Sequence, residues 1–152
     1  MNIPQEIFEE IILDHNRNPH NFEHVNHKFA DHTAYGFNPV CSDEFWINLK
    51  MDGDVICDTG FEGAGCSMST ASVSLMLQSL KGRNVQEAEE LFEKMHHLLT
   101  DANIDANEFN DLGKLQVLAG VRAHPTRIKC VTLGWHLLHA ALNDNPSTIC
   151  TE

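Results

Sequence analysis

Two alternating segments joined by a tight turn are the sequence feature that most constrains the fold. Apolar and polar side chains alternate over residues 44–51, and the same period of two returns over residues 55–61. Asp52-Gly53 separates the segments and favours a two-residue type I′ turn. We therefore predict an antiparallel hairpin, and a preceding strand at residues 33–37 would complete a three-stranded sheet.

Most of the remaining chain has the apolar spacing of helices. The N-terminal segment has this spacing, Asn84 begins a capping-box pattern, and Pro125 suits the first turn of a last helix. These patterns predict an α+β fold: an N-terminal helix, a three-stranded antiparallel sheet and then a cluster of about four helices. We expect residues 1–152 to form one domain, because no repeat or linker divides the chain. The expected helices cover residues 3–16, 66–80, 84–99, 112–121 and 125–142.

Composition and charge exclude several functional classes. The chain has 10 Lys and Arg against 22 Asp and Glu, so its formal net charge is −12 with the 10 His neutral. Nucleic acids and anionic membranes attract positive surfaces, so we expect this protein to bind neither. No apolar run approaches the roughly 18 residues of a membrane span, and the N-terminus lacks the features of a signal peptide. These observations predict a soluble, cytoplasmic protein.

The cysteines indicate metal or thiol chemistry rather than a disulfide framework. Five cysteines, an odd number, occur in a chain without a secretion signal. No Cys-x-x-Cys pair is present, so a metal site would have to combine cysteines from distant segments. Two of the five have no expected role. The alternation places Cys57 in the core, and we expect Cys150 to lie in a frayed tail near the end of the sequence.

Cys41 and Cys66 lie in contexts that favour a metal-bound or charged sulfur. Cys41 and Asp43 are two residues apart before a predicted strand, so both side chains point the same way in an extended segment, as two zinc ligands would. Cys66 follows a Gly-x-Gly loop, whose glycines let the backbone approach another element, at an expected helix N-terminus that stabilises a thiolate. The structural alternatives are a buried Cys41 beside an ordinary surface Asp43, and Cys66 as a small core residue.

Cys130 shares one face of the last predicted helix with Arg127, which lies one turn before it. A guanidinium beside a cysteine favours the charged sulfur, and the alternative is a buried helix cysteine beside a solvated arginine. If the segments converge, the chain supplies the four ligands that a tetrahedral zinc site uses. These ligands are Cys41, Asp43, Cys66 and Cys130.

Three ordered motifs resemble the U-type iron–sulfur cluster assembly family. They are Asn38–Asp43, Ile56–Ser72 and Arg127–Trp135, and the resemblance spans nearly the whole chain. Lys129 stands where the IscU-like branch of that family has a histidine immediately before its third cysteine. In this residue, and in a longer insertion before Arg127, the chain resembles the SufU-like branch.

The resemblance implies a SufU/IscU-like fold and a function in iron–sulfur cluster biogenesis. It implies zinc bound by Cys41, Asp43, Cys66 and Cys130, with Arg127 engaging a pyridoxal-phosphate-dependent cysteine desulfurase of the SufS-like type. Cys41 would accept persulfide sulfur from that enzyme, and the sulfur would pass to downstream iron–sulfur assembly proteins. The expected activity is therefore that of a zinc-dependent sulfurtransferase.

Other functions remain open at this point. Cysteine and carboxylate ligands also bind iron, so the protein could instead be a scaffold that assembles and transfers a [2Fe–2S] cluster. Zinc could also be purely structural in a partner-binding protein, or the cysteines could belong to a redox-sensing domain. The chain departs from the family at Ser42, where a glycine is usual. If φ is positive there, serine costs on the order of 1–2 kcal/mol.

Overall fold

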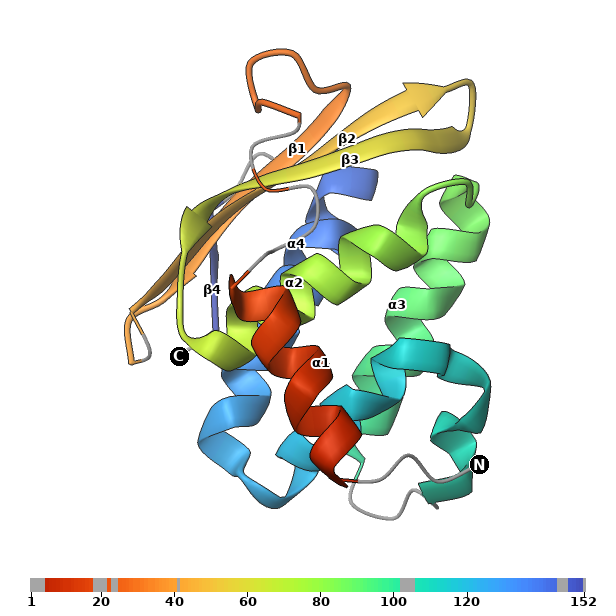
Figure 1. Ribbon diagram of the computed structural model, residues 1–152. Helices are drawn as coiled ribbons and strands as arrows, with labels where there is room; N and C mark the ends of the chain where they lie inside the picture. The colour runs from red at the N-terminus through yellow and green to blue at the C-terminus, as the bar shows by residue number, and fades with distance from the viewer. Residues whose placement is uncertain are drawn as a thin grey trace.

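The protein is built from one sheet packed against a group of helices (Figure 1). The computed structural model describes residues 5–17, 22, 25–40, 42–101, 106–144 and 148–151. The α+β architecture predicted from the sequence is confirmed. The elements in chain order are α1 (Gln5–Arg17), β1 (His32–Asn38), β2 (Asp43–Asp52), β3 (Val55–Ala64), α2 (Ser67–Leu80), α3 (Val85–Thr100), η1 (Ala106–Ala123), α4 (Pro125–Leu142) and β4 (Ile149–Cys150).

The described strands form a four-stranded sheet in the order β3-β2-β1-β4. β1, β2 and β3 make the antiparallel meander that the alternation predicts, and β4 adds a short parallel strand beside β1 that the sequence did not predict. The β1–β2 pairing ends with Asn38 opposite Asp43. The loop that connects the two strands therefore leaves the sheet at the part of the sequence that contains the predicted ligands Cys41 and Asp43. Alternate residues of β2 enter the core, and Phe45, Ile47 and Leu49 are completely buried.

α2 and α4 pack directly against the sheet, α4 on β1 and β2, and α2 on β3. α1 lies on α2, while α3 and η1 contact α4 (Figure 1). Trp135 of α4 is buried in this core, and its indole N–H donates to Ser72 Oγ of α2 at 3.2 Å. This contact holds α2 and α4 side by side and helps to fix the two helix starts near Cys66 and Cys130.

Several predicted helix boundaries are confirmed. Asn84 and Glu87 form a capping box at the start of α3, and Pro125 lies in the first turn of α4. The helix predicted at residues 112–121 lies inside η1, a 3-10 helix interrupted at Gly113, where φ is 56° and ψ is −131°. None of the helices in the described ranges is long and apolar enough to cross a bilayer.

The prediction that Cys57 is a core thiol is wrong, because this residue is exposed. The β2–β3 register pairs Lys50 with Asp58 and Met51 with Ile56. Cys57 is therefore the extra residue of a bulge between these two pairs, and a bulge shifts which side chains face inward. Ile56 is completely buried as a result, and Cys57 faces solvent.

Candidate metal centre

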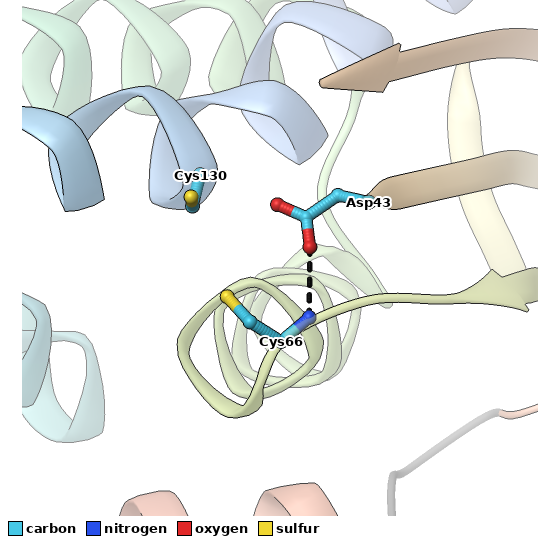
Figure 2. Close-up of side chains that lie close together, drawn as sticks. All are labelled: Asp43, Cys66 and Cys130. Atoms are coloured by element: carbon cyan, nitrogen blue, oxygen red, sulfur yellow. Dashed lines mark hydrogen bonds between the residues drawn. The ribbon is translucent and has the colours of Figure 1, made fainter. Parts of the chain in front are cut away.

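Three of the four predicted ligands lie together at one end of the sheet. Asp43 is the first residue of β2, Cys66 is the N-cap of α2, and Cys130 lies in the second turn of α4. One potential ligand atom from each of them lies within 4.8 Å of the other two (Figure 2). Ligand atoms on a tetrahedral zinc lie about 3.3–3.8 Å apart at ordinary bond lengths, so shifts of about 1 Å would let these three share an ion.

The two carboxylate oxygens of Asp43 have different environments. The side chain is 1% exposed, and Oδ1 accepts a hydrogen bond from the backbone N–H of Cys66 at 2.7 Å (Figure 2). Oδ2 is buried and has no hydrogen-bond partner among the described residues. An unsatisfied buried polar atom costs about 1–3 kcal/mol, and more when it is charged. A bound cation would remove this cost, so the carboxylate fits a metal ligand.

The start of α2 is arranged to accept negative charge. Cys66 has an extended backbone (φ −66°, ψ 166°), and its Sγ accepts a hydrogen bond from the Ser69 backbone N–H at 3.5 Å. The Ser69 hydroxyl oxygen lies 3.3 Å from the same sulfur. Backbone N–H groups and the dipole at a helix N-terminus stabilise a negatively charged sulfur. The prediction that Cys66 lies at a helix N-terminus is confirmed.

Gly65 allows Asp43 and Cys66 to meet. A Cβ at this position would lie 2.5 Å from Asp43 Oδ1, 2.6 Å from Ser69 Oγ and 2.9 Å from Phe45 Cζ. These separations are shorter than those found around real Cβ atoms, so a larger residue would displace the carboxylate or its neighbours. The expected close approach of the glycine-containing loop to another element is confirmed at Gly65.

Cys130 and Arg127 lie one turn apart on α4, as the sequence spacing predicts. Their accessibility differs: Cys130 is 1% exposed, whereas Arg127 is an exposed residue. The cysteine therefore faces the interior with Asp43, and the arginine remains accessible to a partner at the surface. The role of Arg127 in engaging a desulfurase stays a prediction.

Cys41, the fourth predicted ligand, lies outside the described residues, and its position stays a prediction. Both of its neighbours in sequence are described. Val40 is 71% exposed, and Ser42 has φ 57° and is also exposed. The positive φ that would make serine unfavourable at this position is therefore confirmed.

The other two cysteines lie outside this group. Cys57 and Cys150 are both exposed. The expectation that Cys150 lies in a frayed tail is wrong, because it belongs to β4 and pairs with Phe37 of β1. This pairing joins segments more than a hundred residues apart, so the position near the end of the sequence gave no sign of it.

Sequence reasoning assigned no role to Asn38, which is buried at the end of β1. Its Oδ1 accepts a hydrogen bond from the Val40 backbone N–H at 3.0 Å, the pattern of an Asx turn. The Asn-Pro dipeptide was the available signal, because it favours the initiation of a turn. Asn38 thus shapes the backbone immediately before Cys41.

Comparison with known proteins assigns this chain to one family. Residues 7–150 match the NifU-like N-terminal domain family. The chain therefore belongs to this family, and its relatives include scaffold proteins of iron–sulfur cluster assembly. The resemblance found in the sequence motifs is confirmed.

Two relatives and one solved structure are similar over most of the chain. The zinc-dependent sulfurtransferase SufU of Bacillus subtilis is 36% identical over 132 residues, which cover 87% of this chain and 86% of the relative. The iron–sulfur cluster assembly scaffold protein IscU of Streptococcus pyogenes is 33% identical over 136 residues, covering 90% of this chain and 82% of the relative. The solved structure is of a candidate iron–sulfur cluster assembly scaffold protein for the SUF system from Fervidobacterium islandicum. It has a TM-score of 0.74 and 29% identity, and covers 91% of this chain and 99% of that one.

Proposed function

We propose that this protein is a zinc-dependent sulfur acceptor in iron–sulfur cluster biogenesis. The observation that carries the proposal is the convergence of Asp43, Cys66 and Cys130, with a buried carboxylate oxygen that lacks a hydrogen-bond partner among the described residues. The similarity to a zinc-dependent sulfurtransferase supports zinc as the metal. The proposed partners are a pyridoxal-phosphate-dependent cysteine desulfurase and downstream iron–sulfur assembly proteins.

Zinc would be held by Asp43, Cys66, Cys130 and Cys41, the set that the sequence predicts for a tetrahedral site. When bound, zinc would keep its sulfur ligands deprotonated at neutral pH. Asp43 accepts the Cys66 backbone N–H, so the carboxylate also orients the start of α2. The exposed Arg127 would contact the desulfurase and bring its persulfide to the loop that contains Cys41.

Sulfur transfer is an exchange at the terminal sulfur of the persulfide. The Cys41 thiolate attacks that sulfur, a new S–S bond forms on Cys41, and the old S–S bond breaks. The electron pair of the broken bond remains on the desulfurase cysteine, which takes the persulfide proton. Cys41 then carries the persulfide, and no external oxidant or reductant is needed.

Mass spectrometry after incubation with a desulfurase and cysteine tests this function. We expect the mass of one sulfur atom to be added to the Cys41 peptide. Cys41→Ser should abolish this addition. Cys57→Ser should leave it intact, because Cys57 is exposed and outside the ligand group. A Cys41 that stays unmodified while a control acceptor gains sulfur would refute the proposal.

A second candidate function is a scaffold that assembles and transfers a [2Fe–2S] cluster. The similarity to IscU scaffold proteins favours it, since the same sulfur and carboxylate donors also bind iron. Elemental analysis and visible spectra separate the two candidates, because zinc is colourless and the cluster is not. A stable cluster formed by anaerobic reconstitution and passed to an apo acceptor would favour the scaffold.

A further inference from the structure

Residues 148–151 contribute a strand to the sheet beside the candidate metal centre. We call residues 148–151 the C-terminal strap; it contains β4, which lies along β1 at the edge of the sheet (Figure 1). Ile149 pairs with Gly36 of β1. A Cβ at Gly36 would lie 2.6 Å from Ile149 O and 2.7 Å from Leu137 Cδ2 of α4. Gly36 therefore permits the strap, β1 and α4 to pack closely at one point.

Thr151 connects the strap to α4, which carries Cys130, and to β1, the strand that pairs with the Asp43-carrying strand β2. Its backbone N–H donates to Phe37 O near the end of β1 at 3.3 Å. Its hydroxyl donates to Lys129 O of α4 at 3.2 Å. Lys129 immediately precedes Cys130. Thr151 is thus hydrogen-bonded both to the end of β1 and to the turn of α4 that contains Cys130.

Asn38 extends this connection into the loop between β1 and β2. Its buried side-chain Nδ2 donates to Thr151 O at 3.3 Å, while its Oδ1 accepts the Val40 N–H at 3.0 Å. Asn38 is also the register partner of Asp43. The same amide therefore contacts the strap on one side and fixes the backbone just before Cys41 on the other.

We propose that the C-terminal strap is a positioning element of the metal centre, acting through Thr151 and the positioning residue Asn38. It holds the paired strands β1 and β2, the second of which carries Asp43, against the α4 turn that carries Cys130. Groups that orient ligands without touching the metal commonly change metal affinity by about 10–100-fold when they are removed. This inference rests on the proposed function, because it assumes that the ligand group binds a metal.

Metal affinity of point variants in the full chain tests the strap. Co²⁺ is the first probe, because its visible absorption depends on ligand type and geometry; Zn²⁺ affinity follows by competition with a chelator. We expect Thr151→Val to weaken binding about threefold to tenfold through loss of one hydroxyl hydrogen bond, and Thr151→Ser to restore it. Thr148→Val is the matched control, since Thr148 is an exposed residue of the same strap, and it should bind as the unchanged protein does.

Hydrogen exchange on the metal-free protein provides a readout that does not depend on metal. We expect the Val40 amide to exchange about threefold to tenfold faster in Thr151→Val and in Asn38→Ala, with exchange in α3 unchanged. A chain that ends after residue 147 should show the same change and lose about tenfold or more in metal affinity.

Unchanged Co²⁺ spectra, metal affinity and Val40 exchange in Thr151→Val and in the shortened chain would overturn the inference. If the unchanged protein binds neither Co²⁺ nor Zn²⁺ through sulfur, the proposed function fails. The Val40 exchange rate then still decides whether the strap orders the loop. The two failures are therefore distinguishable.

Discussion

Ser42→Gly tests whether the loop between β1 and β2 is strained at the residue after Cys41. Ser42 has φ 57°, a left-handed conformation that costs a residue with a Cβ about 1–2 kcal/mol. Glycine removes this cost but is more flexible in the unfolded chain, which offsets about 0.5–1 kcal/mol. Because Ser42 is exposed, little packing is lost. We therefore expect the free energy of unfolding to rise by about 0.5–1 kcal/mol.

Urea unfolding of the metal-free protein measures this change. With a slope of about 1–3 kcal/mol per molar urea, the midpoint should rise by about 0.2–1 M while the slope stays the same. Ser42→Ala is the matched control, since it removes the hydroxyl but keeps the Cβ, and it should show no comparable gain. A lower midpoint for Ser42→Gly, or an equal gain for Ser42→Ala, would refute the assignment of strain to this φ.

Three further variants test the ligand group and the α3–α4 surface. Gly65→Ala introduces a Cβ 2.5 Å from Asp43 Oδ1, so we expect about 1–3 kcal/mol of destabilisation in urea unfolding together with weaker Zn²⁺ binding. Asp43→Asn keeps an oxygen that can accept the Cys66 N–H but removes the negative charge. Zn²⁺ affinity measured by chelator competition should fall about tenfold or more, while the urea midpoint of the metal-free protein should not fall, because an isolated buried charge is costly. Burial, and then the nearby His96 and His139, lower the pKa of His136. The unfolded chain therefore binds the proton more readily, so the free energy of unfolding should fall as the pH is lowered from about 7 to about 5. It should fall less in His136→Gln. Equal pH profiles of unfolding for the two proteins would contradict this reasoning.

The fold was predictable where each element has one buried face. Phe45, Ile47 and Leu49 are completely buried, and this alternation correctly indicated β2 from local sequence. β4 has only two residues and pairs with β1 across more than a hundred positions, so it has no period to detect. The wrong prediction that Cys57 faces the core has a similar origin, because the residue types around a bulge do not identify which residue is left unpaired.

The ligand residues of the candidate site were predictable from the sequence, whereas the hydrogen bonds that position them were not. Cys66 at a helix start and Asp43 at a strand start follow from local patterns, and the structure brings both to Cys130. The role of Asn38 depends on the Thr151 carbonyl, 113 residues away, so no local pattern reveals it. Cys41 lies outside the described residues, and its membership of the ligand set still rests on the sequence.

The carboxylate of Asp43 links ligand placement to folding. Its Oδ1 accepts the Cys66 N–H, so forming the start of α2 also orients the carboxylate. Its Oδ2 has no hydrogen-bond partner among the described residues, so a cation there would relieve a cost that the fold otherwise carries. Cys130 comes from α4, whose position depends on its packing against the sheet and α2. Metal affinity should therefore depend on how well α4 packs against the hairpin, and metal removal should weaken β2, α2 and α4 together.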